Sequence, residues 1–205
     1  MLVIILVFML VIGGAYVLYN QLGKDIPTQQ LMVHTTPLPT NEPAHEEMPE
    51  NQPATESETA SQEQPKVIKA PDFHVYDKDG NTVHLSNFFG KPIVLNFWAS
   101  WCGPCQSEMP DFNDKHRELD GDVHFVMVNM TDGGRETISS ASAFIEKNGY
   151  SFPVFFDTTG EAAATYGAYS LPTSFFINAE GHIIAQAVGA INASTLQRGI
   201  DMIAN

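Results

Sequence analysis

The hydrophobic positions divide the chain of 205 residues into three blocks. Residues 2–19 form one apolar run without a charged side chain. Residues 20–66 contain no aromatic residue, and positions 41–65 hold seven Glu, four Pro and no Lys or Arg. Residues 67–205 carry alternating and continuous apolar segments, both Trp and both Cys. We therefore expect one folded domain over residues 67–205, preceded by two segments that lie outside its core.

The apolar first block has the length of a membrane span. Its eighteen residues would extend about 27 Å as a helix, close to the roughly 30 Å hydrocarbon core of a bilayer. We interpret residues 1–19 as a transmembrane signal anchor. A cleaved signal peptide is the alternative, because Gly13 and Ala15 fit a small-residue cleavage site. Since an export signal sends the following chain across the membrane, we expect the folded domain on the extracytoplasmic side of the cell membrane.

The second block predicts a disordered acidic linker over residues 20–66. Such a composition buries too little apolar surface to offset the entropy lost on ordering. Repulsion between its glutamates extends the segment. We interpret it as a tether for the folded domain, with an acidic docking tail as the alternative.

In the third block, residues 67–205, the spacing of hydrophobic residues alternates between patterns typical of strands and patterns typical of helices, which predicts an α/β fold. Two alternating runs flank Asp79–Gly80, which is a hairpin signal. Ser86 is expected to cap a short helical turn, and a continuous apolar run over 93–98 predicts a strand buried on both faces. A helix is expected from about Gly103 to Leu119, with a kink at Pro110. The remaining predicted elements are strands at 123–128, 152–156, 173–177 and 182–186, and helices at 137–148, 160–166 and 192–203.

The two cysteines stand at the predicted junction between strand and helix. A thiolate at Cys102 would be stabilised by the amides and dipole of the helix N-terminus, and Cys105, one turn later, could resolve a mixed disulfide. A purely structural disulfide here would close a very short loop and add little stability. Zinc would need two further ligands, and His116 and His124 lack the usual ligand spacing. The pair predicts thiol–disulfide chemistry without a metal or another cofactor.

The charge balance excludes nucleic acid as a partner. The chain has a formal net charge of −14, and residues 67–205 hold sixteen acidic and eight basic residues. An acidic domain repels phosphate backbones. The protein disulfide substrate that we expect is instead indicated by the cysteine pair.

The segment around the cysteines resembles a known active site. Residues 97–105, Phe-Trp-Ala-Ser-Trp-Cys-Gly-Pro-Cys, are similar to the active-site segment of the thioredoxin superfamily. Residues 70–73, 85–88, 90–92 and 108–110 resemble the membrane-anchored TlpA/ResA-type branch. The resemblance covers the third block and implies a thioredoxin-like mixed sheet flanked by helices, with an added N-terminal β-hairpin. It implies a thiol–disulfide oxidoreductase.

The resemblance also assigns substrate-binding residues. The run Leu171-Pro172-Thr173 is similar to the family's cis-proline loop, which faces the cysteines and binds the substrate backbone. Trp101 is expected on the contact surface beside the reactive cysteine, with packing as its alternative role, whereas Trp98 is expected in the core. The remaining residues predicted to contact the substrate are Gly103 and Pro104.

One residue departs from the thioredoxin pattern. Thioredoxins usually carry a buried Asp in the strand before the motif, and this chain has Asn96 there. An amide cannot titrate as a carboxylate does, so the ordinary proton relay is in doubt. Glu108 lies three residues after Cys105 on the same helix face, and the ResA-type branch uses a Glu at the matching position. We expect Glu108 to be catalytic together with Cys102 and Cys105, with a solvated surface Glu as the alternative.

The direction of the reaction and the partners follow from the resemblance. Gly103-Pro104 is the thioredoxin-like dipeptide and favours a reductase. The resemblance suggests apocytochrome c as the substrate, a membrane electron donor of the CcdA/DsbD kind, and a monomer. The alternatives are a disulfide-forming oxidase, a non-catalytic redox sensor or binding module, and a peroxidase. The peroxidase would require a Thr where the chain has Ala99.

Overall fold

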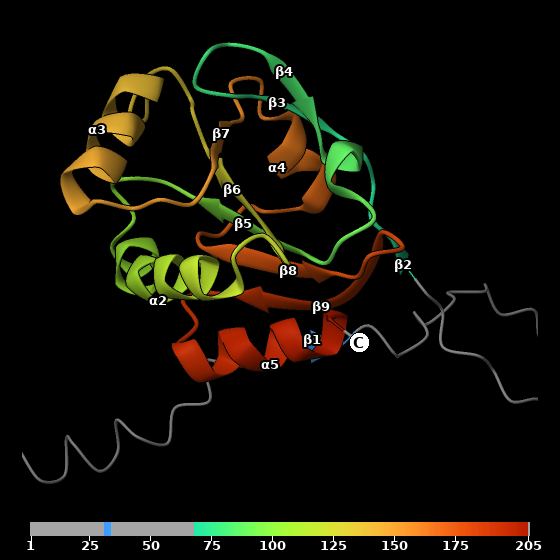
Figure 1. Ribbon diagram of the computed structural model, residues 1–205. Coiled ribbons are helices and arrows are strands. Elements are labelled where there is room, and N and C mark those ends of the chain that lie inside the picture. Colours follow the sequence, from blue (N-terminus) through green and yellow to red (C-terminus); the bar gives the residue numbers. More distant parts are fainter. Residues whose placement is uncertain (1–30, 34–67, 205) are drawn as a thin grey trace, which may run out of the picture. The chain divides into compact units, whose positions relative to one another are not determined.

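The computed structural model describes residues 31–33 and 68–204, which fall within one unit of the chain, residues 31–205. In this part a mixed sheet is covered by helices on both faces (Figure 1), which confirms the predicted α/β class. The predicted anchor, residues 1–19, and nearly all of the predicted linker lie outside the described residues. None of the helices within the described ranges is both long enough and apolar enough to cross a bilayer.

The observed elements from β3 onward match the predicted ranges to within two residues. The strongest predictions were the strand over 93–98 and the helix over 103–119, whose bounds are those observed. The elements in chain order are β1 (Met32–Val33), β2 (Ile68–Lys69), β3 (His74–Tyr76), β4 (Thr82–His84), the 3-10 helix η1 (Leu85–Phe88), β5 (Ile93–Trp98), α2 (Gly103–Leu119), β6 (His124–Asn129), α3 (Ile138–Asn148), β7 (Val154–Phe156), α4 (Glu161–Tyr166), β8 (Thr173–Ile177), β9 (His182–Val188) and α5 (Ala193–Ile203).

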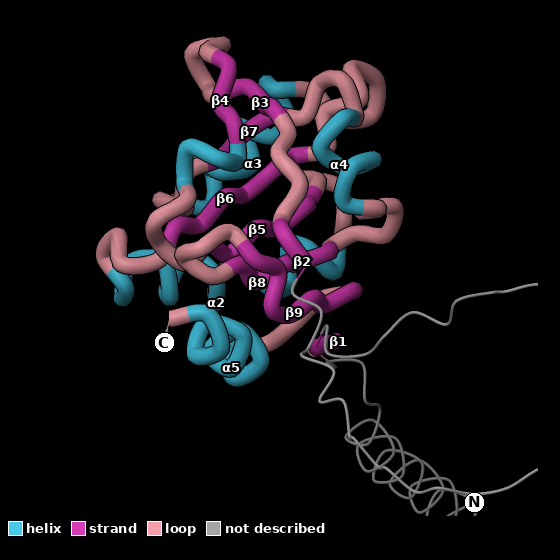
Figure 2. Tube along the Cα trace, turned by 90° about the vertical axis from the view of Figure 1, so that its right-hand side faces the viewer, coloured by secondary structure: helices cyan, strands magenta, loops and turns pink. Residues whose placement is uncertain are grey.

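The sheet has the strand order β1-β9-β8-β5-β6-β7-β3-β4, and β2 also pairs with β9. Strands β5, β6 and β7 are parallel, whereas β8 is antiparallel to both β5 and β9. The hairpin β3–β4 joins the edge of β7 through Tyr76 and Phe156. The predicted N-terminal hairpin is therefore confirmed as an extension of the sheet, visible beside β7 in Figure 2.

Alternate residues of the central strands enter two separate cores. On β5, Val94 and Trp98 pack in the core that contains the apolar residues of α2 and α5. Their neighbours Leu95 and Phe97 pack in the opposite core, with α4 and η1. Because side chains alternate along a strand, Asn96 shares the face of Val94 and Trp98 and points towards α2. This register is what brings Asn96 to the candidate active site.

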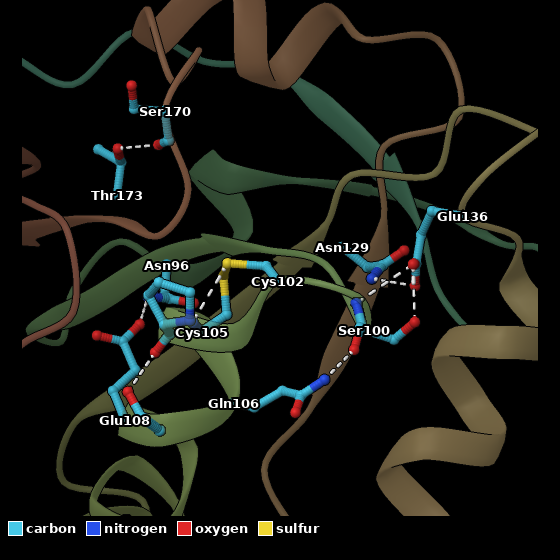
Figure 3. The surroundings of a disulfide bond; sticks show 12 residues. Asn96, Ser100, Cys102, Cys105, Gln106, Glu108, Asn129, Glu136, Ser170 and Thr173 are labelled. Atoms are coloured by element: carbon cyan, nitrogen blue, oxygen red, sulfur yellow. Dashed lines mark hydrogen bonds between the residues drawn. A yellow bond between two sulfur atoms is a disulfide. The ribbon is translucent and has the colours of Figure 1, made fainter.

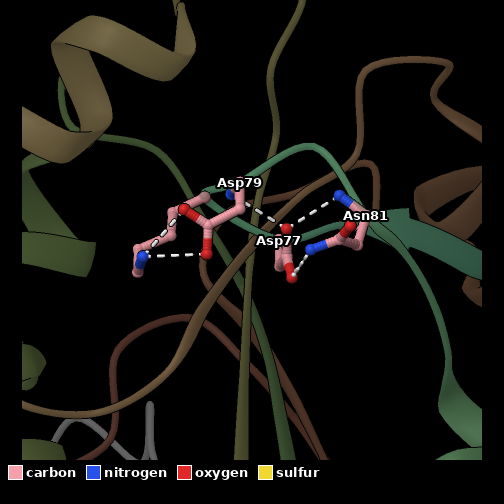
Figure 4. Close-up of polar contacts among 4 residues, drawn as sticks. Asp77, Asp79 and Asn81 are labelled. Atoms are coloured by element: carbon pink, nitrogen blue, oxygen red, sulfur yellow. Dashed lines mark hydrogen bonds and ion pairs between the residues drawn. The ribbon is translucent and has the colours of Figure 1, made fainter.

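The turn between β3 and β4 shows why its sequence was a hairpin signal. The Asp77 carboxylate accepts hydrogen bonds from the Asp79 amide at 2.9 Å and from the Asn81 amide at 2.8 Å (Figure 4). The Asn81 side-chain amide adds a third bond to Asp77 at 2.9 Å. Gly80 has a φ of 82°, a conformation that a residue without Cβ adopts at little cost. The side chains and the glycine together close the hairpin.

One sequence prediction about this part of the fold was wrong in detail. Ser86 does not cap the short turn: η1 begins one residue earlier, at Leu85, after His84. The amide and hydroxyl of Ser86 instead donate to Asp72, each at 2.9 Å, so the carboxylate before β3 satisfies them. The long helix α2 continues through Pro110, as its predicted range requires, and the kink expected at this residue stays a prediction.

The predicted disordered linker contains one short strand. Met32 and Val33 form β1 and pair antiparallel with Gln186 and Ala185 of β9, so the prediction of disorder is wrong for these residues. The outer edge of β9 offers unpaired amides and carbonyls, and an extended apolar segment can satisfy them. Leu31 beside this strand packs on the core that contains α2 and α5.

Candidate active site

The two cysteines lie where β5 leads into α2, and a disulfide joins them (Figure 3). Cys102 is the N-cap residue of α2, and Cys105 lies in its first turn. Their Cα atoms are 5.2 Å apart. Cys102 is 5% exposed and Cys105 is fully buried. The two sulfur atoms are therefore not equivalent towards an incoming substrate.

The helix N-terminus favours a thiolate at Cys102. The Cys105 amide donates a hydrogen bond to the Cys102 sulfur at 3.2 Å. Pro104 stands in the first turn, where a missing amide proton leaves no helical hydrogen bond unmade. Amide donors and the positive end of the helix dipole both lower the pKa of a thiol at such a position. This arrangement suits Cys102 for the attack on a disulfide.

A groove of about 560 Å³ opens beside Cys102. It brings together four of the residues predicted to bind substrate, namely Trp101, Gly103, Pro104 and Leu171. Trp101 is 41% exposed, so its ring belongs to the surface of this groove, whereas Trp98 is fully buried, as predicted. The groove is completed by residues that sequence reasoning did not select: Met130, Asp132, Arg135, Ala168 and Tyr169.

The loop before β8 forms one wall of the groove. The Leu171–Pro172 peptide bond is cis, as the resemblance implied. Among the described residues no hydrogen-bond partner is recorded for the backbone of Leu171, so a substrate strand could use its amide and carbonyl. Pro172 and Thr173 are buried: the Pro172 carbonyl accepts from Gly189 at 2.8 Å, and the Thr173 hydroxyl donates to the Ser170 carbonyl at 2.6 Å (Figure 3). These two residues thus hold the loop and do not line the groove.

Glu108 is a buried carboxyl group, not a solvated surface residue. Only 2% of it is exposed, on the face of α2 that also buries Cys105. Its Oε1 accepts from the Asn96 side chain at 2.8 Å, and its Oε2 accepts from the Ile191 amide at 2.9 Å. Burial raises the pKa of Glu108 to about 8, against the lowering effect of these two hydrogen bonds. A carboxyl group with this pKa exchanges protons near neutral pH.

Asn96 links Glu108 to the sheet. Its Nδ2 donates to Glu108 and also to the Ser174 hydroxyl at 2.9 Å, from the neighbouring strand β8. Its Oδ1 is buried and has no recorded partner among the described residues. The position at which thioredoxins usually carry Asp therefore holds an amide that binds the carboxyl group of Glu108, as Figure 3 shows.

A second buried carboxylate lies on the other side of the cysteine pair, and sequence reasoning missed it. Glu136 is fully buried, and its Oε2 accepts from the Ser100 hydroxyl at 2.8 Å and from the Ser100 amide at 3.2 Å. Its Oε1 accepts from Asn129 at 3.0 Å (Figure 3). Ser100 stands two residues before Cys102, so Glu136 holds the segment that leads into Cys102.

A zinc site was the alternative role of the two cysteines. Throughout the part of the chain that the structure describes, no three His, Cys, Asp or Glu side chains are grouped in a way that could hold a metal ion. His116 and His124 each lie against an aromatic ring instead, of Phe125 and Phe88 respectively.

Residues 68–186 match the model of a protein family described as the AhpC/TSA family. The thiol-disulfide oxidoreductase ResA of Bacillus thuringiensis subsp. konkukian (strain 97-27) is 34% identical over 138 residues, which are 66% of this chain and 76% of that protein. The match includes the cysteine motif and most of the described sheet.

Solved structures show the same fold. A protein of Chlorobium tepidum assigned as thiol:disulfide interchange protein DsbE has 33% identity and a TM-score of 0.61, over 68% of this chain and 97% of that one. The exposed lipoprotein thioredoxin of Streptococcus pneumoniae strain TIGR4 has 31% identity and a TM-score of 0.55, over 64% of this chain and 98% of that one. The predicted thioredoxin-like fold is confirmed.

Proposed function

The chain belongs to the AhpC/TSA family and is a thiol–disulfide oxidoreductase, and from this premise we propose that it is a membrane-tethered reductase of protein disulfides outside the cytoplasm. The observation that carries the proposal is the unequal placement of the two cysteines. Cys102 lines the groove, whereas Cys105 is fully buried behind it. A substrate disulfide can therefore reach Cys102 first, and Cys105 can attack the resulting bond from inside.

The reaction needs two exchange steps. The Cys102 thiolate attacks one sulfur of the substrate disulfide, that S–S bond breaks, and the other substrate sulfur leaves as a thiolate that takes a proton from water. The Cys105 thiol then loses its proton and attacks the Cys102 sulfur. The second substrate thiolate leaves, and the Cys102–Cys105 disulfide forms. Two electrons pass from the protein to the substrate.

We assign to Glu108 the role of exchanging a proton with the Cys105 thiol. In the second step the Cys105 thiol must lose a proton inside the protein, where water has no free access. Glu108 follows one turn later on the same helix face, and its pKa of about 8 allows it to accept or return a proton near neutral pH. Asn96 and the Ile191 amide hold the carboxyl group in place for this exchange.

Two features support the reductase direction. The motif contains the thioredoxin-like dipeptide Gly103-Pro104. In addition, Cys105 is fully buried, and burial disfavours a charged thiolate, so the dithiol form gains less stabilisation than in a strong oxidant. A dithiol that is weakly stabilised gives up its electrons readily.

The location and the partners extend the proposal. Residues 1–19 would anchor the domain in the membrane, and residues 20–66 would tether it there. The similarity to an exposed lipoprotein of Streptococcus pneumoniae supports an extracytoplasmic site. We propose apocytochrome c as the substrate and a membrane electron carrier of the CcdA/DsbD kind as the donor.

A trapping experiment tests the first step of the mechanism. In a Cys105→Ser chain the mixed disulfide cannot be resolved, so the full chain in detergent should accumulate a Cys102-linked adduct with a disulfide-containing substrate such as insulin. The Cys102→Ser chain, in which only the buried cysteine remains, is the matched control. Equal trapping by both variants would contradict the assignment of Cys102 as the nucleophile.

Assays of catalytic turnover distinguish a reductase from a redox sensor and from a peroxidase. A reductase supplied with dithiothreitol should reduce insulin over many cycles, whereas a redox sensor should react once. A peroxidase should consume hydrogen peroxide, and the buried Ala99 at the position of the required Thr argues against that activity. The oxidase alternative is distinguished by the reduction potential of the Cys102–Cys105 disulfide.

A further inference from the structure

The segment from Asp132 to Glu136 forms a closed loop beside the cysteines. The Asp132 carboxylate accepts from the Gly134 amide at 2.8 Å and from the Glu136 amide at 2.9 Å. The Gly133 amide donates back to the Glu136 carbonyl at 3.0 Å. These bonds give the loop one shape without help from a neighbouring element.

A buried carboxylate fastens this loop to the active site. Glu136 accepts the hydrogen bonds of Ser100 and Asn129 described above, so the end of the loop is tied both to the residues before Cys102 and to β6. Figure 3 shows Glu136 between Ser100 and Asn129. The backbone of this loop therefore has a fixed place relative to Cys102.

Arg135 is the side chain that the loop presents. Its guanidinium carbon lies 3.6 Å from the centroid of the Trp101 ring, and both residues line the groove with Cys102. Stacking on an indole occupies the flat face of a guanidinium and leaves its N–H donors at the rim. Among the described residues no carboxylate or carbonyl is recorded as an acceptor for these donors, and Arg135 is the one cation that lines the groove.

One acidic side chain, Asp132, also lines the groove, but its carboxylate accepts hydrogen bonds from amides of the loop. The hydrogen bonds from the loop amides, first that of Glu136, lower the pKa of Asp132 and direct its carboxylate back into the loop. The other rim of the groove is aromatic, since Tyr169 is 83% exposed there. A polypeptide in the groove thus meets two aromatic rings and one unsatisfied cation.

We propose that Arg135 selects substrate polypeptides that carry a carboxylate close to the disulfide, which it binds while the disulfide lies at Cys102. This inference rests on the proposed exchange at Cys102 and names a substrate class for it. A planar guanidinium binds a carboxylate through two parallel hydrogen bonds. The folded block carries sixteen acidic and only eight basic residues, so the domain as a whole does not attract an acidic substrate. A preference for substrates with a carboxylate must therefore come from a local cation such as Arg135.

The test compares two peptides with the full chain. Both contain one intramolecular disulfide and one Trp, and they differ only in a residue next to the cysteine, Glu in one and Gln in the other. The reduced chain should reduce the Glu peptide about threefold faster, the size of a partly exposed ion pair. Arg135→Gln should bring the ratio to about one, and Arg135→Glu should invert it. The control Lys147→Gln makes the same change of charge on α3, outside the lining of the groove, and should keep the ratio.

The salt dependence gives a second readout. The preference of the unmodified chain for the Glu peptide should shrink as ionic strength rises, since salt screens an exposed ion pair. An equal rate for both peptides, or a preference that Arg135→Gln retains, would overturn the inference while the exchange chemistry stands. If the unmodified chain reduces neither peptide, the proposed reductase function falls, and the inference falls with it.

Discussion

Two buried glutamates flank the cysteine pair, and they differ in how the protein holds them. Glu136 accepts three hydrogen bonds, from an amide and a hydroxyl of Ser100 and from Asn129. Glu108 accepts two, from Asn96 and from the Ile191 amide, and burial raises its pKa to about 8. Glu136 is tied to Ser100, two residues before Cys102, whereas Glu108 lies on the face of α2 that buries Cys105 and is the group that we propose exchanges a proton with that thiol.

Burial of a carboxyl group has a different consequence at each of these two positions. A buried carboxyl group that accepts several hydrogen bonds from one loop is a structural tie, and its removal leaves those donors without acceptors. A buried carboxyl group with few donors shifts its pKa and becomes an acid or base near neutral pH. Variants of the two glutamates should therefore differ in their effects on stability and on exchange rate.

The largest effect should be the pH dependence of stability due to Glu108. The folded protein holds a proton on this group up to about pH 8, whereas the unfolded chain releases it near the ordinary value of 4.5. Between these two pH values the folded state binds more protons, so the free energy of unfolding should fall as pH rises, by on the order of 5 kcal/mol in all. Urea unfolding of the oxidised chain from pH 4 to 9 measures this.

The matched variant is Glu108→Gln, which keeps the shape and removes the titration. Its unfolding free energy should be nearly flat over the same window, so that it exceeds that of the unmodified chain above pH 8. If the free energy of unfolding of Glu108→Gln still fell with rising pH, the proton would have to be bound by another group.

The next effect should be the loss of stability in Glu136→Ala. This change leaves the Ser100 amide and the Asn129 side chain without their acceptor in a buried site, at a cost of about 3 kcal/mol. Unfolding at constant pH measures the loss, and Glu146→Ala, at an exposed position of α3, should cost less than about 0.5 kcal/mol. A similar, small loss in both variants would show that Glu136 is not a tie.

Rates of disulfide exchange should separate the two glutamates further. Glu108→Gln should slow the exchange about tenfold at pH 7 and flatten the dependence of the rate on pH, because the group that takes the proton of Cys105 is gone. Glu136→Gln should change the rate by a similar factor at every pH, since its effect is on the position of the loop. Stopped-flow fluorescence of Trp101 and Trp98 can follow both reactions, and an unaltered pH profile in Glu108→Gln would contradict the proton role.

The smallest effect should come from Ser174→Ala, one step removed from Glu108. The Ser174 hydroxyl is the second acceptor of the Asn96 amide, and its loss should cost about 1 kcal/mol. The Asn96–Glu108 bond remains, so the pH dependence of unfolding should keep its slope. A slope that disappears in Ser174→Ala would mean that the whole network, and not Glu108 alone, binds the proton.

The two glutamates also differ in how far the sequence reveals them. Glu108 could be predicted because helix spacing places it on the face of Cys105, and the apolar run of β5 and the Cys-Gly-Pro-Cys start of α2 fix both elements. Glu136 stands in the run Asp132-Gly-Gly-Arg-Glu136, whose polar composition is that of an exposed loop. Its burial depends on Ser100 and Asn129, which are 36 and 7 residues away.

Contacts between distant segments account for the other differences. Ser86 has the composition of an N-cap, but Asp72, fourteen residues earlier, satisfies it. Met32 and Val33 form a strand because the edge of β9 is there to pair with them. Local pattern predicted the elements themselves, whereas partners brought together by the fold decided these details.

The reduction potential of the Cys102–Cys105 disulfide tests the central claim most directly. It can be measured by equilibrating the full chain in detergent with glutathione or dithiothreitol buffers and trapping the free thiols. We predict a value near that of thioredoxin, about −270 mV, at which the protein donates electrons to substrate disulfides. A value near that of DsbA, about −120 mV, would show that the dithiol form is strongly stabilised and that the protein forms disulfides, which contradicts the proposed direction.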